Sequence, residues 1–126
     1  MLINTMGRAH AEAEKIFRVI LPENGLTVRE EQIVLCHAML DGLLQNKITL
    51  CDAGVGIGKT YAYLIACILT RKYSLRLSQT LVISTSSVAL QRAIVSEYIP
   101  FLSRVLLQEG ILAVSYTHLT LPTNRE

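Results

Sequence analysis

The sequence predicts an α/β fold, in which helices flank a partial parallel sheet and an N-terminal helical segment comes first. One observation is a glycine-rich loop at residues 53–60, between an apolar run and a helical pattern. Another is the β-branched run TLVIS at residues 80–84, which is typical of a strand covered on both faces. A strand, a helix and a second strand in this order form a right-handed βαβ unit, so we expect the sheet to be parallel.

The first part of the chain is predicted to be helical. Residues 6–20 are rich in helix formers, and this helix is expected to end at Pro22, Asn24 and Gly25. A second helix is predicted over residues 27–45, with Thr27 as its N-cap and Glu30 at the capping-box spacing. Apolar residues recur along this second helix at helical spacing, so one of its faces should be buried.

Histidine and cysteine residues give no sign of a metal site or a disulfide framework. His37 is interpreted as a surface residue, because no partner is spaced to join it. Cys36, Cys51 and Cys67 are odd in number and contain no C-x-x-C pair. We interpret all three cysteines as small buried hydrophobes.

Residues 48–52 are predicted to form the strand that enters the glycine-rich loop. The helix that leaves the loop should run over residues 60–72, and it is nearly apolar, so it should be buried against the sheet. After the second strand, a helix is predicted over residues 88–98. Pro100 should interrupt that helix, before an apolar helical pattern resumes at residues 101–107.

The loop at residues 53–60 is interpreted as a phosphate-binding site. Glycine lets backbone N–H groups approach phosphate oxygens, and the following helix points the positive end of its dipole at the same anion. Lys59 would add a charge for the β and γ phosphates of a nucleotide and the Thr60 hydroxyl would ligate Mg²⁺, so these two are the candidate catalytic residues. Ala53 stands where the strict motif has glycine, and a glycine-rich turn that merely caps a helix is the alternative. The candidate nucleotide-binding residues of the loop are Ala53, Gly54, Val55, Gly56, Ile57, Gly58, Lys59 and Thr60.

Hydroxyl-bearing residues follow the second predicted strand. The segment TSS at residues 85–87 lies where α/β proteins bind ligands, and it also opens the helix at residues 88–98. Its hydroxyl and N–H groups would either cap that helix or hold a nucleic-acid phosphate. Their spacing does not choose between these interpretations.

Three separated stretches resemble one family. They are REEQ at residues 29–32, DAGVGIGKTYAYL at residues 52–64, and VISTSSVALQRAIVSEYIPFLSRVL at residues 82–106. Together they are similar to the start of the first motor domain of DinG-type helicases, bacterial relatives of the XPD group in superfamily two. The resemblance covers about residues 22–112 and implies an incomplete RecA-like P-loop NTPase domain at residues 26–112. The N-terminal helix and linker at residues 1–25 come before this domain.

The same resemblance implies roles for particular residues. Gln32, with Arg29, would read the adenine edge of ATP. Thr85, Ser86 and Gln91 would contact the backbone of single-stranded DNA without reading its sequence. The cofactors would be ATP and Mg²⁺, and in the intact protein ATP hydrolysis would drive 5′-to-3′ translocation on single-stranded DNA and duplex unwinding.

Other parts of the family pattern have no counterpart in this sequence. They include the acidic box that holds Mg²⁺, the arginine fingers, the second motor domain and the cysteines that hold an iron–sulfur cluster in many members. An iron–sulfur cluster is therefore expected only in a longer protein, with no ligand among the cysteines of this chain. The chain by itself should bind nucleotide weakly and without turnover.

Two other interpretations remain open at the level of sequence. A P-loop kinase or transport ATPase with no DNA role would explain the glycine-rich loop equally well, but it leaves residues 85–91 unexplained. A non-catalytic nucleotide-binding module would need a closed, stable fold at this length.

Composition and the chain end give the remaining expectations. The chain of 126 residues is 51% hydrophobic and 17% charged, with a net charge of +2 that is too small to indicate nucleic acid by itself. No apolar run is long enough to span a membrane, so we expect a soluble, cytoplasmic bacterial protein. Residues 113–126 continue no pattern and resemble a translated sequencing adapter, so they are interpreted as a non-native tail.

Overall fold

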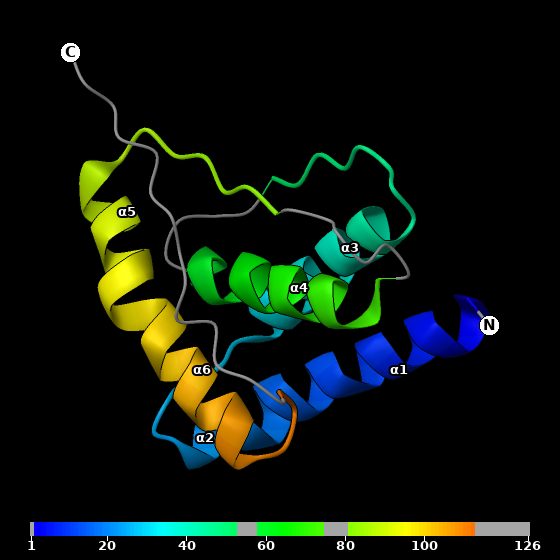
Figure 1. Cartoon of the computed structure of the whole chain (residues 1–126), viewed down its shortest axis with the longest axis horizontal. Helices are drawn as coiled ribbons and strands as arrows, with labels where there is room; N and C mark the ends of the chain where they lie inside the picture. Colours follow the sequence, from blue (N-terminus) through cyan, green and yellow to red (C-terminus); the bar gives the residue numbers. More distant parts are fainter. Residues whose placement is uncertain (1, 53–57, 75–80, 113–126) are drawn as a thin grey trace. The chain divides into compact units, whose positions relative to one another are not determined.

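The computed structural model describes residues 2–52, 58–74 and 81–112, which form helices joined by extended segments and turns (Figure 1). The chain divides into two compact units, Met1–Val82 and Ile83–Glu126. The first unit contains α1 (Leu2–Lys15), η1 (Ile16–Ile20), α2 (Leu21–Glu23), α3 (Glu30–Leu44) and α4 (Lys59–Tyr73), and the second contains α5 (Val88–Ala93), η2 (Ile94–Tyr98) and α6 (Ile99–Gln108).

The predicted parallel sheet is wrong, because the described residues include no strand. Residues 48–52 and 81–84 carry the apolar, β-branched composition of strands, yet they form no ladder in the described part of the chain. Ile48 and Leu50 are 96% and 94% exposed, and Val82 is 81% exposed. A strand is stabilised by hydrogen bonds and side-chain contacts with a neighbouring strand, so local propensity alone did not produce one.

The core of the first unit is made by helices alone. α4 packs against α3 and α1, and α1 also packs against α3 (Figure 1). Full burial of one leucine or isoleucine side chain contributes about 1.5–3 kcal/mol. The apolar residues of α4, which predicted burial against a sheet, are instead buried against α3 and α1. The buried residues of α4 are Ala62, Leu64, Ile65, Ala66, Ile68, Leu69 and Thr70.

Two prolines are accommodated by the same local geometry. Pro22 and Pro100 are each the second residue after a five-residue π-helical turn, η1 or η2. A proline in an α-helix lacks the N–H donor and clashes with the carbonyl four residues earlier, whereas a π turn shifts the bonding to five residues. The prediction that Pro100 interrupts a helix is therefore wrong, because η2 leads directly into α6. The residue before each proline donates to the carbonyl five residues back, Leu21 to Ile16 and Ile99 to Ile94.

The second predicted helix is confirmed, with a different start. α3 begins at Glu30, and its N-cap is Arg29 in an extended conformation, not Thr27. The expectation of buried cysteines holds for Cys36, whereas Cys67 is half-buried and Cys51 is exposed. Cys51 is exposed because it lies in the unpaired segment at residues 48–52.

Two further predictions concern membrane-spanning helices and the end of the chain. In the part of the chain that the structure describes, no helix is both long and apolar enough to cross a membrane. The predicted non-native tail at residues 113–126 lies outside the described residues.

Candidate nucleotide-binding site

The described part of the predicted phosphate loop is the start of α4. Gly58 is the N-cap residue, and its φ of 76° and ψ of 45° lie in the left-handed region. Lys59 is the first residue of the helix and is exposed, and Thr60 follows it and is half-buried. The other predicted residues, Ala53, Gly54, Val55, Gly56 and Ile57, lie outside the described residues.

The start of α4 has the electrostatic character of an anion site. The first N–H groups of an α-helix have no acceptor within the helix, and the helix dipole is positive at this end. The first turn of α4 contains no acidic residue, and Lys59 adds a formal charge to it. Among the described residues, no group of three or more His, Cys, Asp or Glu side chains is arranged to hold a metal ion. Thr60, the residue predicted to ligate magnesium, lies among the described residues.

Gln32 connects the start of α3 to the start of α4. Its Oε1 accepts a hydrogen bond from the Arg29 backbone N–H at 2.9 Å, which is the reciprocal half of a capping box. Its Nε2 donates to the Gly58 carbonyl oxygen at 3.2 Å. The side chain is only 6% exposed, so the amide is both buried and paired. The two residues predicted to read adenine, Arg29 and Gln32, thus lie beside the described end of the phosphate loop.

The contact with Gln32 explains why position 58 is glycine. A Cβ built on Gly58 collides with Nε2 of Gln32 and comes within 3.0 Å of its Cδ. The left-handed backbone at this position would also strain any residue with a side chain. The backbone conformation of Gly58 therefore favours glycine, and a side chain at this position would displace the Gln32 amide.

The predicted DNA-contact residues form the start of α5. Ser87 is the N-cap, and its Oγ accepts from the Leu90 N–H at 3.1 Å. Thr85 Oγ1 accepts from the Ser87 N–H at 3.2 Å, and Gln91 Nε2 donates to the Thr85 carbonyl at 3.1 Å. Ser86 is exposed. The structure therefore brings Thr85, Ser87 and Gln91 together as a helix cap, which is one of the two interpretations of this segment.

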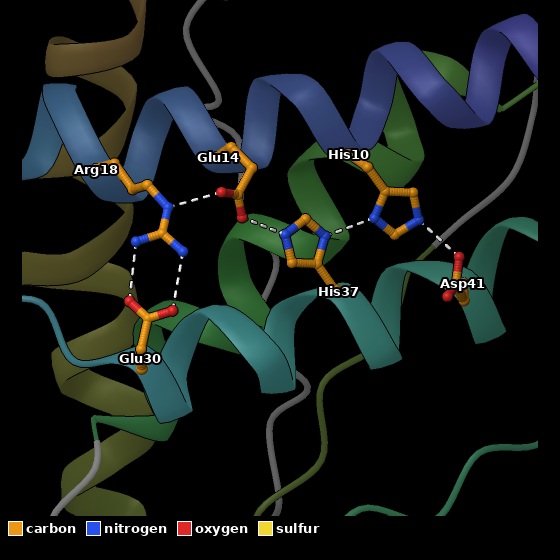
Figure 2. A network of polar contacts seen from close by, with 6 residues as sticks. All are labelled: His10, Glu14, Arg18, Glu30, His37 and Asp41. Carbon is orange, nitrogen blue, oxygen red and sulfur yellow. Dashed lines mark hydrogen bonds and ion pairs between the residues drawn. The ribbon is translucent and has the colours of Figure 1, made fainter.

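Sequence reasoning missed a polar network between α1 and α3, shown in Figure 2. His37 was interpreted as a surface residue without a partner, which is wrong. Its Nδ1 lies 2.5 Å from Nδ1 of His10, and its Nε2 lies 2.6 Å from Oε2 of Glu14. These partners are 27 and 23 residues away along the chain, so only the packing of α1 on α3 brings them together. The available signal was a matched i, i+4 spacing on both helices, His10 with Glu14 and His37 with Asp41.

Comparison with known proteins finds relatives that are similar to part of this chain. A 3'-5' exonuclease DinG of Staphylococcus saprophyticus is 29% identical over 91 residues, and 3'-5' exonuclease DinG proteins of Staphylococcus aureus are 28% identical over 93 residues. The chain resembles DinG proteins. The matched segments cover 72% and 74% of this chain, and the chain spans about a tenth of the length of these curated relatives. No family model and no solved structure matches the chain.

These relatives confirm the coarser part of the sequence interpretation. The three sequence blocks predicted a DinG-like protein, and the relatives are named DinG. Their name describes a 3'-5' exonuclease, so it associates the resemblance with enzymes of nucleic acids. ATP binding, helicase activity and the direction of translocation remain predictions.

Proposed function

We propose that residues 53–60 bind the phosphates of ATP together with Mg²⁺. Lys59 is the cation that contacts the β and γ phosphates, and Thr60 supplies the hydroxyl that ligates the metal. The observation that supports this proposal most is the left-handed Gly58 directly before Lys59 at the start of α4. That geometry directs backbone N–H groups, the helix dipole and a lysine toward one anion.

The adenine base is proposed to contact Gln32, with Arg29 beside it. A glutamine amide has two N–H donors and two acceptor lone pairs on its oxygen. The contacts with Gly58 and Arg29 use one donor and one lone pair. The valence of the amide leaves one donor and one acceptor, which is the pair that the N6 and N7 atoms of adenine require and that the two acceptors O6 and N7 of guanine do not match. Gln32 would therefore select ATP over GTP while it still contacts Gly58.

Calorimetric titration of the 126-residue chain with Mg·ATP tests the phosphate site. We expect weak binding, and the variant Lys59→Ala should weaken it by about tenfold or more, because a charge-assisted contact is lost. Lys47→Ala is the matched control, since Lys47 is an exposed lysine of the same unit that the proposal assigns no role. Equal binding by Lys59→Ala and the wild type would contradict the proposal.

Competition between ATP and GTP tests the role of Gln32. The wild-type chain should prefer ATP, and Gln32→Ala should bind both nucleotides with similar affinity. A variant that keeps the ATP preference would show that Gln32 does not read the base, whatever its effect on folding. Gln45→Ala, which changes an exposed glutamine near the other end of the helix, is the control.

For the whole protein, we propose ATP hydrolysis coupled to 5′-to-3′ movement along single-stranded DNA and to duplex unwinding. The resemblance to DinG proteins supports an enzyme of nucleic acids. Thr85, Ser86 and Gln91 are proposed to contact the DNA backbone. A full-length protein with this segment should bind single-stranded DNA with an affinity that falls as salt rises. A phosphate-transfer or transport ATPase with the same loop would show ATP turnover without DNA binding.

The name of the relatives favours a second candidate, a 3'-5' exonuclease. Incubation of a 5′-labelled partial DNA duplex, which carries a single-stranded 5′ tail, with a full-length protein and Mg²⁺, with and without ATP, distinguishes the two activities. ATP-dependent strand separation supports the motor proposal. Shortening of the DNA from its 3′ end without ATP, and with no strand separation, would support the exonuclease instead.

A further inference from the structure

Two histidines face each other between α1 and α3, and each also contacts a carboxylate. We call His10 and His37 the histidine pair. Nδ1 of His10 lies 2.5 Å from Nδ1 of His37, with ring centroids 4.8 Å apart and planes inclined by 23°. On the outer sides of the pair, Nε2 of His10 lies 2.6 Å from Oδ1 of Asp41, and Nε2 of His37 lies 2.6 Å from Oε2 of Glu14. Figure 2 shows these groups as one row of contacts.

The row consists of three short contacts, and each requires a proton between its two heavy atoms. A contact of this length between two nitrogens, or between a nitrogen and a carboxylate oxygen, is attractive only when one atom donates and the other accepts. Two neutral imidazoles and two ionised carboxylates provide two protons, which leaves one contact with facing lone pairs. Two imidazolium rings provide four protons, so both Nδ1 atoms would carry a hydrogen and repel each other. The observed row therefore fits three protons, with one extra proton on the histidine pair.

Neighbouring charges favour this protonation state. Glu14 accepts from Arg18 Nε at 2.6 Å through its other oxygen, and Arg18 also donates to both oxygens of Glu30. The hydrogen bonds from Arg18 and His37 hold the pKa of Glu14 below its ordinary value, so this carboxylate stays ionised and the proton of its contact belongs to His37. The row and its extension thus contain three carboxylates and one guanidinium, and an extra proton on the histidine pair offsets part of the excess negative charge.

The other groups near the histidine pair stay uncharged or are paired elsewhere. Cys36 of α3 lies near Glu14, and burial raises the pKa of its thiol to about 12. On α4, which packs against both helices, burial raises the pKa of Cys67 to about 11. Lys72 of α4 donates to both oxygens of Glu12 at 2.9 Å. The extra proton of the row is therefore assigned to the histidine pair and not to these neighbours.

We propose that the histidine pair makes the docking of α1 on α3 sensitive to pH, with the tightest docking when the pair holds one extra proton. The contacts connect residues 10–18 of the first helical segment to residues 30–41 of α3. α3 also provides Gln32, which contacts Gly58 at the start of α4. A change in this docking therefore acts on the helix that positions the candidate nucleotide site.

The sign of the pH dependence follows from the proton count. As pH falls from alkaline values, the folded protein gains the central hydrogen bond by binding the first extra proton, so stability rises. As pH falls further, the unfolded chain accepts a second extra proton more readily than the folded protein, because the folded pair would then have two facing N–H groups. Stability then falls. The result is a maximum of stability at an intermediate pH.

Nitrogen NMR of the wild-type chain, labelled with ¹⁵N in histidine, tests the proton count without any substitution. The expected result is an intermediate pH range in which both Nε2 atoms carry a proton and a third proton lies between the two Nδ1 atoms. Two separate transitions should bound this range. A single common transition of both rings, with one proton on each ring above it and two below it, would overturn the proposal.

Urea unfolding of the 126-residue chain between pH 5 and pH 9 tests the effect on docking. The wild type should be most stable at an intermediate pH, and its unfolding equilibrium constant should rise by about tenfold on each side, the scale of one charged hydrogen bond. His37→Asn should remove this maximum and leave a flatter profile, whereas His118→Asn, at a histidine outside the described residues, should keep it. A maximum of the same height in His37→Asn would contradict the proposal. If His37→Asn fails to fold, the NMR measurement on the wild type decides.

Discussion

Gln32 and Gln91 were both predicted to contact a ligand, and the structure uses both amides to hold backbone at the start of a helix. Gln32 Nε2 donates to the Gly58 carbonyl, 26 residues away, at the N-terminus of α4. Gln91 Nε2 donates to the Thr85 carbonyl, only six residues away, before its own helix α5. Gln32 is buried, whereas Gln91 is half-buried.

The difference between the two glutamines lies in what each contact connects. Gln32 joins two helices that are distant in sequence, so its contact exists only when the first unit is folded. Gln91 shapes a local turn that Ser87 also caps, so its loss leaves a second hydrogen bond in place. Substitutions near Gln32 should therefore have larger effects on stability than substitutions near Gln91.

The largest effect is expected for Gly58→Ala. A Cβ in a left-handed backbone costs about 1–2 kcal/mol, and displacement of the Gln32 amide adds about 1 kcal/mol. We expect a loss of about 2–3 kcal/mol in the free energy of unfolding, measured by urea denaturation.

Gly25→Ala is the matched control for this substitution. Gly25 also has a positive φ, of 90°, but no atom lies within 4 Å of a Cβ built there. Gly25→Ala should therefore lower the free energy of unfolding only by the cost of a left-handed backbone, about 1–2 kcal/mol. Equal losses in the two variants would mean that the contact between Gln32 and Gly58 contributes nothing. Because both substitutions break this contact, the double variant Gly58→Ala/Gln32→Ala should lose about 1 kcal/mol less than the sum of the two single losses.

A smaller effect is expected for Gln32→Ala. The substitution leaves the Arg29 N–H and the Gly58 carbonyl without their partner, which costs about 1–2 kcal/mol when the groups are shielded from water. Thermal unfolding followed by circular dichroism measures it. Gln45→Ala should be close to neutral, and a Gln32→Ala chain as stable as Gln45→Ala would refute the structural role of this amide.

The smallest effect is expected for Gln91→Ala. It removes one partly buried hydrogen bond, worth about 0.5–1 kcal/mol, while the Ser87 cap remains. Hydrogen exchange at the first amides of α5 should increase only a few fold. Complete loss of their protection would show that Gln91, and not Ser87, holds the start of this helix.

The sequence predicted the helices better than it predicted their packing. The spacing of apolar residues predicted α3 and α4, and Gly58 with Lys59 predicted the start of α4, because these signals are local. The sheet was wrong because residues 48–52 have strand composition but no described partner, and pairing is a property of two segments.

Pro100 and His37 also show that local sequence signals do not predict how helices continue or pack. A proline usually ends or kinks a helix, yet Pro100 follows η2 in a continuous helical segment. His37 has no partner on its own helix, and the partners on α1 follow only from the packing of two helices. Local features such as the start of α4 were therefore predictable from sequence, whereas contacts shared by two helices were not.

The most direct test of the phosphate-binding proposal is an NMR titration of the ¹⁵N-labelled chain with Mg·ATP. Binding at the start of α4 should shift the backbone amides of Gly58, Lys59 and Thr60, and the side-chain amide of Gln32 should shift with them. The amides of Ser87 and Leu90, at a helix start outside the proposed nucleotide site, serve as the internal reference. Shifts at residues 58–60 that disappear in Lys59→Ala are the predicted result. Unchanged amides at residues 58–60 at saturating Mg·ATP would contradict the account.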